Sequence, residues 1–181
     1  MKKQTKYNLL KYLALFIIGW LVYSNLEVFA SALTGNIARS YGGSYFALKG
    51  ITSLWMGPIG GAIFVIIGLL DESKAMKRCP VLIVSIISGI VITSIEFGTG
   101  YILNHKLGLG IWDYRGLPLA KYFYNQINLF HFFLWILISP FAFWLDNTVR
   151  YYLNLIIGYR EFPMQLNLIS YYRAFFTFRS A

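Results

Sequence analysis

The sequence predicts an all-α integral membrane protein: a polytopic bundle of four transmembrane helices, with a re-entrant or interfacial loop and an amphipathic C-terminal tail. Of its 181 residues, 57% are hydrophobic and 19% aromatic, whereas only 13% are charged. Soluble domains carry about a quarter charged residues, so this composition indicates lipid as the main solvent. It also excludes a disordered chain, a coiled coil and a soluble secreted scaffold. The single cysteine, Cys79, excludes an internal disulfide framework.

Four windows of the sequence are apolar enough to cross a bilayer, which takes about 20 mostly apolar residues. They lie at about residues 12–33, 51–70, 80–104 and 128–145. The stretch 105–127 is broken by Gly, Asp, Arg and Pro, and we expect it to be re-entrant or interfacial. We therefore predict a four-span membrane domain over 1–149 and a basic, aromatic tail over 150–181 that lies on the membrane surface. A fifth span within the tail is the alternative, because the tail is long enough to cross.

The first window has a second interpretation. Lysines, an apolar run and the small residues Ala30-Ser31-Ala32 together imitate a signal peptide with its cleavage site. We interpret the segment as a membrane span rather than as a cleaved signal peptide.

The basic residues predict an orientation in the cell membrane. They concentrate before the first span, in the loop 71–79 and in the tail. By the positive-inside rule, both termini are cytoplasmic and the loops with Arg39 and Arg115 lie outside. The net charge of +9 is thus accounted for by membrane flanks, and no nucleic-acid partner is expected.

Two glutamates, Glu27 and Glu96, lie inside predicted spans. Charged side chains within the bilayer are costly, and by default they face the bundle interior and mark a functional site. With a rise of about 1.5 Å per residue, both carboxylates lie about 24 Å from the cytoplasmic ends of their spans. They suit proton-coupled binding, cation binding or general acid–base catalysis. Alternatively, each acid pairs with an arginine such as Arg39 or Arg115 and locks the bundle.

The loop 105–127 is predicted to be external, on the same side as the two glutamates. Its Trp-Asp-Tyr element, with glycines and Pro118 nearby, is suited to form a lid over a buried polar pocket. The predicted ligand-binding residues are Glu27, Glu96, Asn104, Trp112, Asp113, Tyr114 and Gln126. The catalytic candidates are Glu27 and Glu96.

Other motifs are absent or weak. His105 and His131 match no helical metal-ligand spacing, so packing at the membrane interface is expected, with no metal and no cofactor. The sequence contains no G-x-x-x-x-G-K-[ST] phosphate loop, and therefore no ATPase signature of its own. Gly57 and Gly61 form a small-residue face that lets another helix approach closely.

The sequence resembles the putative ABC transporter type IV membrane family. The resemblance rests on the run from Glu96 to Asn104, the Trp112-Asp113-Tyr114 element and Leu117-Pro118-Leu119. Weaker pieces are Gly19-Trp20 with Glu27-Val28, and the run 53–61. It covers roughly residues 13–145 and leaves the tail outside. Gly60 stands where the family usually has Tyr, and Asn125 where Gly is usual. If the family name describes the function, the resemblance implies that the ATPase is a separate polypeptide.

The preferred function is binding or moving a small molecule, an ion or a lipid through an outer-leaflet polar pocket, as a component of a transporter. The expected partners are the lipid bilayer, that ligand, and either further copies of the chain or a separate ATPase subunit. Two alternatives stay open. One is an intramembrane acid–base enzyme that acts on a lipid or isoprenoid substrate. The other is a membrane scaffold whose acids are structural.

Overall fold

The computed structural model describes residues 2–33, 53–159 and 167–178, apart from the side chains of 27 and 29–33. This part of the chain is helical and contains no strand. The main helices are α1 (Lys3–Leu33), α3 (Met56–Glu72), α4 (Val81–Gly100), α5 (Leu129–Ile157) and α6 (Leu168–Thr177). Shorter turns are the 3₁₀ helices η2 (Met76–Arg78) and η4 (Ala120–Phe123), and the π-helical η3 (Tyr101–Lys106), which prolongs α4. The all-α prediction is confirmed.

Three helical stretches are long and apolar enough to cross a membrane: Lys3–Leu26, Val81–Lys106 and Leu129–Ile157. They correspond to the first, third and fourth predicted spans. The second predicted span corresponds to α3, which has 17 residues and is not among these three. The count of four spans is therefore not confirmed.

Helix α5 is longer than the sequence predicted. The apolar window ends near residue 145, but the helix continues to Ile157 and ends at Gly158, whose φ is +60°. The added turns carry Asp146, Arg150 and Asn154, which recur every four residues and are all buried. One face of the helix is thus polar and turned inward. These polar residues lower the mean hydropathy, so the apolar window ends before the helix does. The predicted boundary at 149/150 falls inside this helix.

Glycines bring α1 and α3 into close contact. A Cβ at Gly60 would lie 2.2 Å from the Cβ of Tyr23, and a Cβ at Gly57 would lie 2.0 Å from the Trp20 ring. Gly61 faces Phe16 in the same way. These distances confirm the small-residue face predicted at Gly57 and Gly61, and they fix the position of Tyr23 beside α3.

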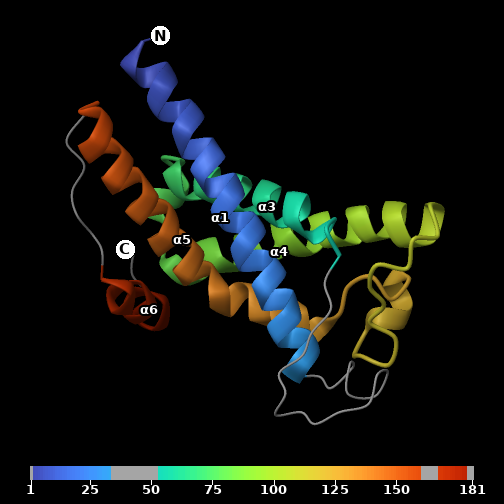
Figure 1. Cartoon of the computed structure of the whole chain (residues 1–181). Helices are drawn as coiled ribbons and strands as arrows, with labels where there is room; N and C mark the ends of the chain where they lie inside the picture. Colours follow the sequence, from blue (N-terminus) through green and yellow to red (C-terminus); the bar gives the residue numbers. More distant parts are fainter. Residues whose placement is uncertain (1, 34–52, 160–166, 179–181) are drawn as a thin grey trace.

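Different segments of the chain lie at the two ends of the bundle (Figure 1). The loop that follows α4 lies at one side of the molecule, whereas α6 and the C-terminal end of α5 lie at the other. Tyr171, Ala174 and Phe175 of α6 join the hydrophobic core, while Ile169 and Phe176 are exposed. With ten residues, α6 is too short to span a bilayer.

The close contact between α1 and α3 predicts that Gly60→Ala lowers the melting temperature. Overpacking of this kind costs about 1–3 kcal/mol. Gly98→Ala is the matched control, because a Cβ at Gly98 meets nothing within 4 Å. Thermal unfolding in detergent should show a clear loss for Gly60→Ala and no loss for Gly98→Ala. Equal melting temperatures for the two variants would contradict the packing.

Candidate functional site

The carboxyl group of Glu96 joins three helices. Glu96 lies on α4 and is buried. The hydroxyl group of Tyr23, on α1, donates a hydrogen bond to Oε1 over 2.5 Å. The indole Nε1 of Trp135, on α5, donates to Oε2 over 2.9 Å. Both oxygens of one buried side chain are thus bonded to donors from the neighbouring helices.

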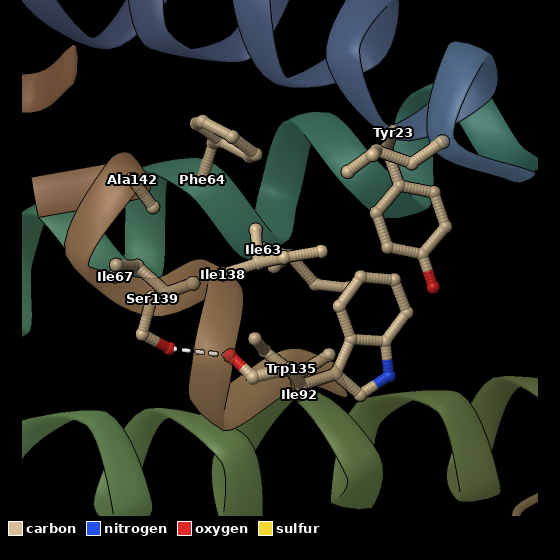
Figure 2. Close-up of a pocket in the computed structure, with 10 residues that line it drawn as sticks. Tyr23, Ile63, Phe64, Ile67, Ile92, Trp135, Ile138, Ser139 and Ala142 are labelled. Atoms are coloured by element: carbon tan, nitrogen blue, oxygen red, sulfur yellow. Dashed lines mark hydrogen bonds between the residues drawn. The ribbon is translucent and has the colours of Figure 1, made fainter. Parts of the chain in front are cut away.

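The rings of Tyr23 and Trp135 are stacked, with centroids 5.2 Å apart and planes at 13°. Beside them is an apolar cavity of about 20 Å³, which also borders Ile63, Ile92 and Ala142. Figure 2 shows the hydroxyl of Tyr23 and the indole nitrogen of Trp135 pointing away from this cavity. The stacked pair therefore separates the apolar space from the bonded carboxyl group.

A second aromatic layer connects Trp135 to the loop. His131, one turn earlier on α5, is buried with its ring 6.4 Å from that of Trp135. Tyr114 of the loop also packs on His131, with ring centroids 4.5 Å apart. Asn128 begins α5: its side chain accepts a hydrogen bond from the His131 backbone N–H. This cap holds His131 between the loop and the Glu96 site.

A hydrogen-bond network attaches the loop to the end of α4. Asn104 donates to the backbone oxygen of Trp112 over 3.0 Å and to Gln126 Oε1 over 2.7 Å. It also accepts a bond from the backbone N–H of Ile111. The Trp112 indole in turn donates to the backbone oxygen of Gln126 over 3.0 Å. Gly100 makes room for this network, since a Cβ there would lie 2.7 Å from both Trp112 and Gln126.

The structure thus places most of the predicted site residues in two groups, the loop network and the Glu96 site. Asp113 and Glu27 belong to neither group. Asn104, Trp112 and Gln126 form the network, and Tyr114 reaches the Glu96 site through His131. Asp113 instead lies at the surface, where its Oδ2 pairs with Arg115 over 3.1 Å and its Oδ1 accepts the Arg115 N–H. Glu27 lies on α1, one turn after Tyr23, and its side chain lies outside the described residues.

Sequence reasoning missed Tyr23 and Trp135, the two partners of Glu96. Both are aromatic residues in apolar segments, where bulky rings are expected as packing or interface residues. Their positions could have identified them, because residues four apart share a helix face. Tyr23 lies one turn before Glu27, and Trp135 lies one turn after His131. No group of three or more His, Cys, Asp or Glu residues suited to a metal ion is found in the described ranges.

Sequence reasoning also missed a charged cluster at the other end of the bundle. Lys11, Asp146 and Arg150 are each no more than 2% exposed. Burial, reinforced by the charge of Asp71, raises the pKa of Tyr171 to about 12, so this phenol of α6 faces the cluster in its neutral form. The sequence windows had assigned these residues to span flanks, although Asp146, Arg150 and Asn154 follow a helical spacing.

A family model described as putative ABC-transporter type IV matches residues 36–176, more than half of the chain. The match extends beyond the resemblance found in the sequence, since it includes the tail as far as α6. It begins after α1. No curated protein and no solved structure matches the chain.

The loop network predicts that Asn104→Leu loosens the segment 107–127. Losing these bonds leaves groups around Gln126 unpaired, which costs about 1–3 kcal/mol. Hydrogen–deuterium exchange should become faster in this segment. The control is Asp113→Asn, whose side chain is exposed and whose effect should stay within about 0.5 kcal/mol. If Asn104→Leu leaves exchange in the loop unchanged, the network does not hold it.

Proposed function

The chain belongs to the putative ABC-transporter type IV family, and from this membership and the geometry of Glu96 we propose that it is the membrane-embedded component of a transporter. It binds a small molecule, an ion or a lipid next to Glu96, and this carboxyl group couples binding to a proton or a cation. The stretches of α1, α4 and α5 that are long and apolar enough to cross a membrane support this placement in the bilayer.

One observation carries the proposal: the two partners of Glu96 are not equivalent. The indole of Trp135 can only donate, whereas the hydroxyl of Tyr23 can donate or accept. A charged Glu96 accepts from both, as described above. A protonated Glu96 still accepts from Trp135 and donates its proton to Tyr23. The carboxyl group can therefore gain or lose a proton while the three helices stay joined, which suits a coupling residue.

The loop 105–127 is proposed as the lid of this site. Trp112 and Tyr114 form its inner surface, and Asn104 and Gln126 attach it to α4. Asp113 anchors the outer turn of the lid through Arg115. We propose that Glu27, on the next turn of α1 after Tyr23, contributes a second carboxyl group to the pocket.

The proposed assembly contains other subunits. Because the sequence has no phosphate-loop motif, a separate polypeptide supplies any ATPase activity. We place the protein in the cell membrane with both termini in the cytoplasm, following its basic flanks. Further copies of the chain are the other candidate partner.

A scaffold function is the second candidate, and a specific observation favours it. Both oxygens of Glu96 are already bonded to protein groups, and such bonds alone tie α1, α4 and α5 together. In this case Glu96 has a structural role and the chain positions other subunits.

Native mass spectrometry of the purified protein in detergents and nanodiscs separates the two candidates. We expect a bound small molecule, ion or lipid that Glu96→Gln loses. Glutamine fits the site, because its oxygen accepts from Trp135 and its amide donates to Tyr23. The melting temperature of Glu96→Gln should therefore change little. The control Ser94→Ala, an exposed change on the same helix as Glu96, should retain the ligand.

The opposite pattern would contradict transport. If nothing copurifies in several detergents and in nanodiscs, and Glu96→Gln lowers the melting temperature, Glu96 is structural. Retention of the same ligand by Glu96→Gln would remove Glu96 from the binding site.

A further inference from the structure

Five charged side chains meet at the end of the bundle opposite the loop, outside the candidate site. Together they form the α1–α3–α5 charge cluster: Lys11 of α1, Asp71 and Glu72 of α3, and Asp146 and Arg150 of α5. Charges buried in a protein are costly unless they are paired and hydrogen-bonded. The pairing of these five side chains therefore shows whether the positive and negative charges of the cluster balance.

Two positive charges face three negative ones. Lys11 pairs with Glu72 over 2.5 Å. Arg150 is shared: it lies 3.4 Å from Asp146 Oδ2, 3.8 Å from Glu72 Oε1 and 3.9 Å from Asp71 Oδ2. With all five groups ionised, the cluster carries one unmatched negative charge.

Asp146 is the most deeply buried of the three acids, and its Oδ2 accepts a hydrogen bond from Arg150 Nη1 over 3.4 Å. Its side chain is 2% exposed, against 21% for Asp71 and 24% for Glu72. Its Oδ1 is buried and makes no hydrogen bond within the described ranges. Gly68 of α3 lies against this oxygen, since a Cβ there would be 2.7 Å from it. Asp71, which is less buried, accepts a bond from Asn147 over 3.0 Å.

Among the residues that the structure describes, the other groups near the cluster do not supply a further positive charge to Asp146. Tyr171 of α6 is neutral, and a hydrogen bond links it to Asn147. Lys77 of the α3–α4 connection is exposed and acts on Asp71. The remaining neighbours from α1 and α5 are Tyr7 and Asn154, whose side chains bond to each other.

We propose that Asp146 is a proton-binding site that controls how α5 packs against α1 and α3. With a proton on Asp146, two acids remain for two bases and the cluster is balanced. Loss of this proton to solvent, on the side where Asp71 and Glu72 are partly exposed, leaves a third carboxylate buried and loosens α5. The proposal rests on the charge cluster and does not depend on ligand binding at Glu96.

Infrared spectroscopy of the purified protein in detergent tests this site directly. The test uses Glu96→Gln as its background, because this change removes any band from a protonated Glu96. In that background we expect the band of a protonated carboxyl group to persist at neutral pH and to disappear when Asp146→Asn is added. Asp113→Asn, which changes an exposed acid, should leave the band in place. A neutral-pH spectrum that Asp146→Asn does not change would overturn the proposal.

The pH dependence of unfolding provides a second readout. The folded protein binds one proton more than the unfolded chain, so its stability falls as the pH rises. One such proton changes the unfolding equilibrium constant by up to tenfold per pH unit. Asp146→Asn should lose this part of the dependence. The same slope in Asp146→Asn and the wild type would contradict a proton at this position.

Asp71→Asn covers the case in which Asp146→Asn does not fold. Removing one negative neighbour weakens proton binding at Asp146, so the protonated-carboxyl band should disappear at a lower pH than in the wild type. A band that titrates at the same pH in both proteins would show that the proton is not held by this cluster.

Discussion

Pairing of buried polar groups along α5 is the constraint on which the arrangement of this protein depends. Inside a bilayer no water is available, so a buried polar group needs a partner within the protein or it costs free energy. Helix α5 meets this requirement twice: Trp135 bonds to Glu96 of α4, and Arg150 lies among three acids of α3 and α5. The helices between these two levels then pack through apolar side chains and glycines. Moving α5 along its axis would break both sets of contacts together.

These two levels give the ends of the bundle different chemical characters. At the loop end, a carboxyl group is bonded to neutral aromatic donors, and side-chain amides attach the loop to the end of the same helix. At the other end, oppositely charged side chains form a crowded cluster that includes the neutral phenol of α6. The apolar cavity beside Tyr23 and Trp135 extends along α5 to Ala142, one turn before Asp146. Changes of charge at either level therefore act on the same helix.

The helical fold and much of the site follow from the sequence, because they depend on local patterns. Apolar windows predicted α1, α4 and α5, and the cost of burying a charge singled out Glu96. Partners that come from distant segments could not be predicted in this way: Tyr23 and Trp135 look like ordinary packing residues until the helices are placed side by side. The length of α5 was missed for a related reason, since Asp146 and Arg150 resemble the polar end of a span unless their partners on α3 are known. The Trp-Asp-Tyr motif placed Asp113 in the site with Trp112 and Tyr114, but the turn directs its side chain to Arg115 at the surface.

The indole N–H resonance of Trp135, followed by NMR as the pH is varied, tests the central role of Glu96 most directly. A hydrogen bond to a charged carboxylate is shorter and stronger than one to a neutral acceptor. If Glu96 exchanges a proton while staying bonded to Tyr23 and Trp135, the resonance should move with pH in the wild type and stay fixed in Glu96→Gln. A resonance that does not move in the wild type would contradict proton coupling at Glu96. A movement that persists in Glu96→Gln would assign the titration to another group, with the neighbouring His131 as the first candidate.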